Sequence, residues 1–139
     1  MDAGYELAVA IVGRLKADAV VSAFVSGRVY DRVPAEPKPE PPYISFGPTD
    51  SVQDDAECIE GQEISCQIDC WSYGAGEAYG SAEVRKLSGA VLKSLHGAEI
   101  TLTDNAFVML EHRVSRVMRD PEGVMNHAAM TFSAFVEIN

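Results

Sequence analysis

The sequence predicts an α+β fold, in which a mostly antiparallel sheet with a long C-terminal hairpin carries helices on one face. Apolar residues recur at helical spacing near the N-terminus and in the middle of the chain. They alternate with polar residues in one central segment, and two long apolar segments flank a turn near the C-terminus. The 139 residues have the length of one ordinary domain and contain no internal repeat, so residues 1–139 are expected to form a single domain.

Two helices are expected first. Residues 5–15 carry apolar side chains every four residues, and basic residues stand in the last turn, where the helix dipole favours them. Asp18 can then cap a short second helix that Gly27 ends. From residue 28 to residue 30 the chain is expected to be extended.

A proline-rich segment follows at residues 34–42. Five prolines in nine residues exclude a helix or a central strand, so an extended, polyproline-like arm is expected. Residues 43–47 are expected to form a short strand. The arm is a candidate contact with other proteins, through Pro37, Pro39 and Pro41.

The next segment is strongly acidic. Residues 48–61 are interpreted as a solvated loop, because carboxylates without a basic partner repel one another and resist burial. Six acidic residues and no basic one lie between positions 50 and 63: Asp50, Asp54, Asp55, Glu57, Glu60 and Glu63. Asp50, Asp54, Asp55 and Glu57 are candidates for contacts with a partner.

The central part of the chain predicts a strand and a helix. Residues 62–72 alternate between apolar and polar side chains, which is typical of a strand with one buried face. Residues 77–96 carry an apolar stripe of Val84, Leu87, Val91 and Leu95, and Gly97 ends this predicted helix. We expect Ile64, Ile68, Leu87, Val91, Phe132 and Val136 to be buried where this helix meets the sheet.

The C-terminal third predicts β structure. Residues 100–103 are expected to form a short strand, and residues 107–119 and 124–138 a long hairpin. Asp120-Pro-Glu-Gly123 between them has the residue pattern of a type I turn. Apolar residues of the first hairpin strand fall on both parities, which indicates a bulge or cover on both faces. Arg116, Arg119 and Glu122 are further interface candidates.

Composition limits the partners. The net charge is −10 and the sequence pI about 4.6, which disfavours specific binding of nucleic acid or of an anionic membrane. The longest apolar runs are too short to span a bilayer, and the N-terminus lacks the positive charge of a signal peptide. Three cysteines leave one without a partner in any disulfide scheme, which favours a reducing compartment.

No catalytic constellation is found. Cys66 and Cys70 lie roughly 13 Å apart on one strand, too far for a disulfide, and are expected to be small buried apolar residues. His112 and His127 could meet across the hairpin, as a metal or pH-sensing pair or, as we favour, a polar cross-strand contact. The acidic segment lacks the spacing of a calcium loop, and neither Gly-x-Ser-x-Gly nor a phosphate-binding loop is present. No catalytic residue, metal or cofactor is expected.

Taken in order, several stretches resemble the phage tail completion, or tail terminator, family, including members from gene transfer agents and lambdoid or HK97-like prophages. No single stretch is specific; their order and spacing along nearly the whole chain carry the resemblance. The stretches are Leu15-Lys-Ala-Asp18, Gly27-Arg-Val-Tyr-Asp31, Pro42-Tyr-Ile-Ser-Phe-Gly47, Gln67-Ile-Asp-Cys-Trp-Ser72, Leu95-His-Gly97 and Arg119-Asp-Pro-Glu-Gly123.

The resemblance implies a structural role without catalytic residues. Family members form a hexameric ring that caps the tail tube at the neck-proximal end of a particle tail and joins it to the head. The implied partners are other copies of the chain, the tail tube protein and a stopper or adaptor protein of the neck, with assembly in the bacterial cytoplasm. DNA would pass through the lumen without specific binding. Another neck protein, such as a head-closure, stopper or minor tail subunit, and a small enzyme or ligand-binding domain are the alternatives.

Overall fold

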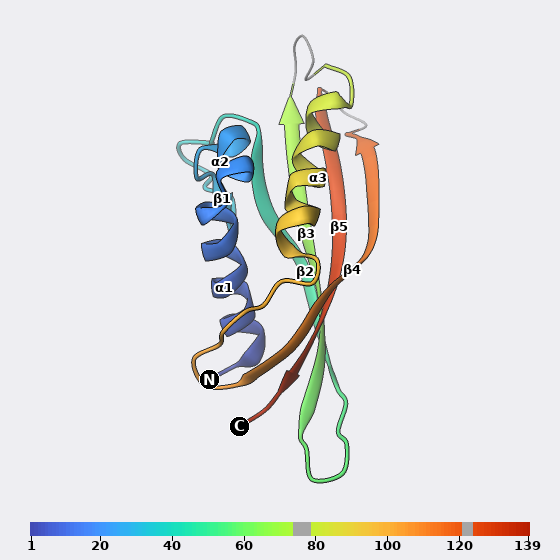
Figure 1. Cartoon of the computed structure of the whole chain (residues 1–139). Coiled ribbons are helices and arrows are strands. Elements are labelled where there is room, and N and C mark those ends of the chain that lie inside the picture. Colours follow the sequence, from blue (N-terminus) through green and yellow to red (C-terminus); the bar gives the residue numbers. More distant parts are fainter. Residues whose placement is uncertain (74–78, 121–123) are drawn as a thin grey trace.

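One five-stranded sheet organises the chain in the computed structural model, which describes residues 1–73, 79–120 and 124–139 (Figure 1). The strand order is β1-β2-β3-β5-β4, so β3 and β5 are central. Only β1 and β2 pair in parallel; all other neighbours are antiparallel. The strands are β1 Val29–Tyr30, β2 Tyr43–Gln53, β3 Gly61–Tyr73, β4 Ala106–Arg119 and β5 Met125–Glu137.

Three helices cover one face of this sheet (Figure 1): α1 Ala3–Ala17, α2 Ala19–Val25 and α3 Ala82–Leu95. Asp2 caps α1 by accepting from the Tyr5 amide. Asp18 caps α2 as predicted, because its carboxylate accepts from the Val20 and Val21 amides. These hydrogen bonds and the charge of Arg14 hold the pKa of Asp18 below its ordinary value. The predicted α+β class is confirmed, with the helices on one side.

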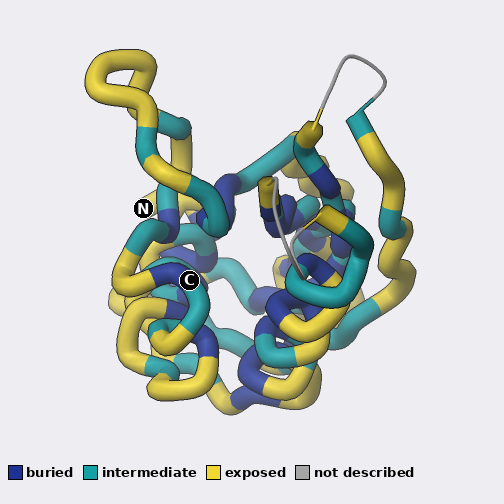
Figure 2. Tube along the Cα trace, turned by 90° about the horizontal axis from the view of Figure 1, so that it is seen from above, coloured by how far each residue is buried: buried dark blue, intermediate teal, exposed yellow. Residues whose placement is uncertain are grey.

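The core lies between the helices and the sheet (Figure 2). The predicted alternation in β3 is confirmed, since Ile64, Cys66, Ile68 and Cys70 are all buried toward the helices. The stripe of α3 packs onto this face together with the even-numbered residues of β5. All six predicted core residues are buried: Ile64, Ile68, Leu87, Val91, Phe132 and Val136.

The predicted loop over residues 48–61 is wrong in its first half. β2 continues to Gln53 and pairs with β3, from Thr49 opposite Cys66 to Gln53 opposite Gln62. A register shift between Phe46 and Thr49 accommodates Pro48. Proline is tolerated there because no second described strand pairs with this part of β2, so no described partner needs its missing N–H.

Two further predictions need correction. Residues 100–103 form no strand; they follow a stretch in which the Gly97 amide donates to the Leu110 carbonyl, and Leu102 packs into the core. The helix α3 begins at Ala82 after a turn at residues 79–81, and the predicted start at Glu77 falls outside the described residues.

The C-terminal hairpin is confirmed, because β4 and β5 pair along their length. The irregular pattern of β4 has the predicted explanation: its register shifts between Phe107 and Met109 and between His112 and Val114. The Asp120 amide donates to the Met125 carbonyl, which brings the strand ends together. The type I turn itself involves residues 121–123, which lie outside the described residues.

A buried carboxylate ties the N-terminal helix to the start of β4. Glu6 in α1 accepts from the Asp104 amide at 3.0 Å and from the Asn105 side chain at 2.8 Å. Desolvation raises the pKa of Glu6, but these hydrogen bonds outweigh it and hold the pKa below its ordinary value. The N-terminal helix is thereby fixed to the segment that leads into β4.

Leu87→Ala should lower the free energy of unfolding by about 2–5 kcal/mol, because the leucine is fully buried between α3 and the sheet. Lys93→Ala in the same helix is the matched control, since Lys93 is exposed and should change stability by less than about 0.5 kcal/mol. Chemical denaturation measures both. Equal midpoints for the two variants would contradict this packing of α3.

Candidate functional site

The predicted interface residues occupy three separate surfaces. Asp50, Asp54, Asp55 and Glu57 lie on the β2–β3 hairpin, Pro37, Pro39 and Pro41 on the β1–β2 connection, and Arg116 and Arg119 on the edge strand β4. Glu122 lies outside the described residues. The structure therefore does not gather these residues into one site.

The β2–β3 hairpin extends past the rest of the chain at one end of the molecule (Figure 1). Its tip is narrow, because Ala56 and Ile59 exchange two backbone hydrogen bonds around Glu57 and Cys58. Cys58 adopts a left-handed conformation, with a φ of 60°, to close this turn. The predicted acidic loop is thus a defined hairpin tip.

The acidic side chains of the hairpin do two different things. Asp55 accepts from the Gly61 amide at 3.0 Å and from the Gln53 side chain at 2.6 Å, so it holds the tip to the ladder. Asp50, Asp54 and Glu57 are exposed, and their side chains make no hydrogen bond or ion pair with the described residues. Those three carboxylates are free to meet a partner, whereas Asp55 is committed to the turn.

The proline-rich segment is a connection rather than a free arm. It links two adjacent parallel strands, and the Arg28 side chain donates to the Pro42 carbonyl at 3.0 Å, which fixes its end. Glu36–Pro37 and Pro41–Pro42 are cis peptide bonds. Pro37 is exposed, and Pro39 and Pro41 are half-buried. The reach of the segment is limited, because both of its ends are held by the paired strands β1 and β2.

The arginines of β4 also differ in role. The Arg119 guanidinium lies 5.4 Å from the centre of the Tyr79 ring and donates to the Tyr79 carbonyl, so it supports its own chain. Arg113 forms an exposed ion pair with Glu111 at 3.3 Å. Arg116 is exposed and contacts no carboxylate among the described residues. Arg116 is therefore the arginine of this strand with a free charge.

The sheet face opposite the helices carries a cluster that sequence reasoning missed. The His127 Nε2 atom lies 2.6 Å from the Asp69 carboxylate, and its ring stacks on Trp71 with centroids 3.9 Å apart. The Gln67 side chain also donates to Asp69, and the Trp71 indole donates to the Ser45 hydroxyl. The shared parity of residues 67, 69 and 71 was the available signal, and the partner strand was needed to add His127.

This cluster has no catalytic arrangement within the described part of the chain. A histidine held by a carboxylate activates a hydroxyl or thiol only when one lies within hydrogen-bond reach. The only hydroxyl bonded to the cluster, that of Ser45, accepts from Trp71 instead. The described residues also contain no group of three or more metal-ligating side chains. Stacking and hydrogen bonds here stiffen the open face of the sheet.

The predicted contact between His112 and His127 is wrong. His127 pairs with Met118, whereas His112 pairs with Phe132. Because Arg119 lies opposite Asn126, the register of the hairpin places His112 six residues along β4 from the partner of His127. The His112 amide donates to the His96 ring at 3.0 Å, so His96 closes the end of α3 against β4.

The cysteines behave as buried apolar residues. Burial raises the pKa of the Cys66 thiol to about 11 and raises that of Cys70 further, to which the neighbouring Asp69 charge contributes. Both thiols stay protonated near neutral pH and are poor nucleophiles. They form no disulfide.

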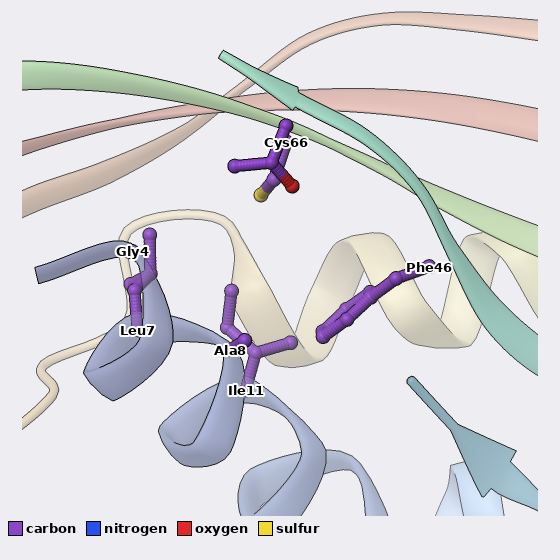
Figure 3. A pocket seen from close by; sticks show the side chains of 7 residues that line it. Gly4, Leu7, Ala8, Ile11, Phe46 and Cys66 are labelled. Carbon is purple, nitrogen blue, oxygen red and sulfur yellow. The ribbon is translucent and has the colours of Figure 1, made fainter. Parts of the chain in front are cut away.

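Two hollows adjoin α1. The first is a cavity of about 10 Å³ between α1, β2 and β3, lined by Leu7, Ile11, Phe46 and Cys66 among others (Figure 3). It can hold at most about one water molecule, so it is a packing gap. The second is an open groove of about 880 Å³ between α1, β1 and the outer side of β2.

None of the described helices has the length and hydropathy needed to span a membrane.

Comparisons with known proteins agree over nearly the whole chain. Residues 9–137 match the family model described as Tail completion protein gp17. A chain of the virion of a native gene transfer agent particle is 28% identical, with a TM-score of 0.84 and 96% of each chain covered. The gp17 protein of bacteriophage SPP1 is 20% identical, with a TM-score of 0.59 over 99% of this chain and 91% of that one, and shows the fold alone. No curated protein matches the chain.

Asp55→Ala should speed hydrogen exchange at the Gly61 amide, because this substitution removes the acceptor that protects that amide at the base of the tip. Asp54→Ala is the matched control, since it removes the same charge from an exposed side chain without a bond. Amide exchange followed by NMR measures the difference. Identical exchange at Gly61 in both variants would show that Asp55 does not hold the tip.

Proposed function

The chain belongs to the tail completion protein gp17 family, and from that premise we propose that it is a tail terminator, a ring that caps the tail tube and joins it to the neck. The match over residues 9–137 carries this proposal, together with the likeness to a chain of a gene transfer agent virion. Membership makes the chain a structural protein of a phage or phage-like particle, in contact with other tail or neck proteins.

A hexameric ring is the assembly that we propose. A repeated head-to-tail contact between identical subunits closes into a ring when its rotation is right. The subunit has two separate surfaces. The acidic hairpin lies at one end, and the edge strand β4, with a free arginine, lies on one flank. Such separate surfaces support contacts along the tail axis and around the ring.

We assign the contacts along the tail axis to the tip of the β2–β3 hairpin. The hairpin that carries Asp54 and Glu57 projects beyond the rest of the chain (Figure 1), where these exposed side chains can meet a basic surface of the tail tube protein or of a stopper or adaptor protein. Charge complementarity of this kind guides docking more than it adds affinity. The proline-rich connection, where Pro37 is exposed, is proposed as a second surface for contacts with other proteins.

The proposal also covers the lumen. Six copies of a chain with net charge −10 would carry a formal charge of −60, which repels DNA phosphates and lets DNA pass without specific binding. The sheet face opposite the helices would add few specific contacts with DNA, because Ser65, Gln67, Thr131 and Ser133 on it are uncharged and polar. We propose a structural rather than a catalytic role, which membership of the tail completion family supports.

The assembly proposal predicts a mass of six subunits. Light scattering of the purified protein, alone and with its tail tube protein, should give a hexamer in at least one condition. A strict monomer in both, with no binding to the tube protein, would overturn the terminator assignment. Binding to a neck adaptor ring without binding to the tube would identify a different neck protein.

Removal of two tip charges should weaken assembly without affecting folding. The variant with Asp54→Asn and Glu57→Gln should give fewer tailed particles, and the loss should resemble the effect of high salt on the unaltered protein. The pair Glu83→Gln and Glu99→Gln changes the net charge by the same amount away from the tip and is the matched control. Counting tailed particles by electron microscopy decides, and equal yields for both pairs would show that the tip only faces solvent.

A further inference from the structure

We propose that the ring closes through the two edges of the sheet. The outer stretch of β2, Thr49–Gln53, would pair with residues 114–119 of β4 of a second copy. This inference rests on the proposed ring and adds the contact that makes it. One subunit has two complementary sheet edges on opposite flanks, and each edge is left without a second described partner over only part of its length.

The free part of the first edge is set by the shortness of β1. β1 pairs with β2 only at Ile44 and Ser45. From Thr49 to Gln53, β2 pairs with β3 on one side and with no described strand on the other. An unpaired stretch of this kind presents alternate N–H and C=O groups to another chain.

A groove accompanies this free stretch. It is bordered by α1 and by β2, with Thr49 and Ser51 on its wall. Tyr5 and Val9 of α1 line it and are 60% and 54% exposed, which is high for large apolar side chains in a helix that packs on a sheet. A strand laid beside β2 would cover both side chains and bury their apolar surface.

The second edge is β4, which pairs with no described strand on its outer side over its C-terminal part. Near the middle of β4, the Leu110 carbonyl accepts from the Gly97 amide and the His112 amide donates to His96, so this part is occupied within the chain. Residues 114–119 pair with β5 on one side and with no described strand on the other. Val114 and Met118 project from this stretch, 54% and 37% exposed.

Direction favours the pairing. β2, β3, β5 and β4 alternate in direction, so β2 and β4 of one subunit run antiparallel. Rotation about an axis along the strands preserves direction. β4 of the next copy would therefore meet β2 antiparallel, in the stronger of the two ladder geometries.

The offset between the free stretches also fits. Ser51 shares its row of the sheet with Leu110, whereas Ser45 shares its row with Arg116. The free stretches therefore lie about six residues apart along the strands, or roughly 20 Å at ~3.3 Å per residue. Four strands, β2, β3, β5 and β4, repeat around such a ring, because β1 borders only the other part of β2. At ~4.8 Å apart they are roughly 19 Å wide. A strand tilt of 35–45°, as in closed barrels, shifts the register by roughly 13–19 Å over that width, and the upper end of this range is close to the offset.

Charge supports a second copy as the occupant. On the sheet face opposite the helices, Asp50 stands exposed on the free stretch of β2 and Arg116 on that of β4, and neither contacts an opposite charge among the described residues. The acidic hairpin has no basic residue, whereas six of the 11 basic residues lie in α3 and β4: Arg85, Lys86, Lys93, Arg113, Arg116 and Arg119. In a head-to-tail contact, the acidic flank of one copy would therefore face the basic flank of the next copy.

Disulfide trapping between copies tests the contact. In a Cys58→Gly background, which removes the exposed thiol at a position with positive φ, Val52→Cys is combined with Val114→Cys or Met118→Cys. All three positions are exposed on the same sheet face. Mild oxidation should give a ladder of linked subunits in at least one combination. Val52→Cys with Val108→Cys, which is 50% exposed but lies outside the free stretch, is the matched control and should give none.

A charge exchange gives an independent reading. Asp50→Arg and Arg116→Glu should each raise the dissociation constant of the oligomer at least about tenfold, and the double variant should restore it. An oligomer that shows no disulfide-linked subunits, and whose dissociation constant is not restored in the double variant, would overturn the edge pairing and leave the ring in place. A chain that stays monomeric at every concentration and with tube protein would overturn both.

Discussion

The pairing of β3 with β5 is the constraint on which the rest of the structure depends. The two central strands run side by side without a register shift, from Gly61 opposite Glu137 to Tyr73 opposite Met125. Because the register is continuous, one parity of both strands faces the helices throughout and the other forms the open face. The core, the Asp69–His127 contact and the projecting hairpin all follow from this alignment.

The outer strands match that central pair only in part, and their mismatch creates the surfaces. β1 is two residues long, so most of β2 is left at an edge, and the bulges of β4 shift its side chains relative to β5. β3 is 13 residues long and carries the end of β2 beyond the body of the molecule. The strand pairing is thus most continuous in the middle of the sheet, and the unpaired stretches that we propose for contacts with other chains lie at its edges.

The sequence predicted the elements whose burial is one-sided and missed those whose environment depends on distant residues. Ile64 to Cys70 alternate because one face meets α3, and that pattern is visible without a structure. Residues 48–53 are a strand exposed on both faces, so no alternation marks them. The composition also identified the acidic segment, but the structure was needed to show that hydrogen bonds from Gly61 and Gln53 separate Asp55 from its free neighbours. Likewise, Arg119 was expected at an interface and instead contacts Tyr79.

The construction of the hairpin tip has a consequence for how the protein can change over time. Asp55 and the Ala56–Ile59 bridge hold the shape of the tip, while Asp54 and Glu57 contribute only their charges. Substitutions at the exposed positions can therefore change the charge of the tip at little cost in folding. If the tip docks as proposed above, its choice of partner can change while its shape and the sheet beneath it stay the same.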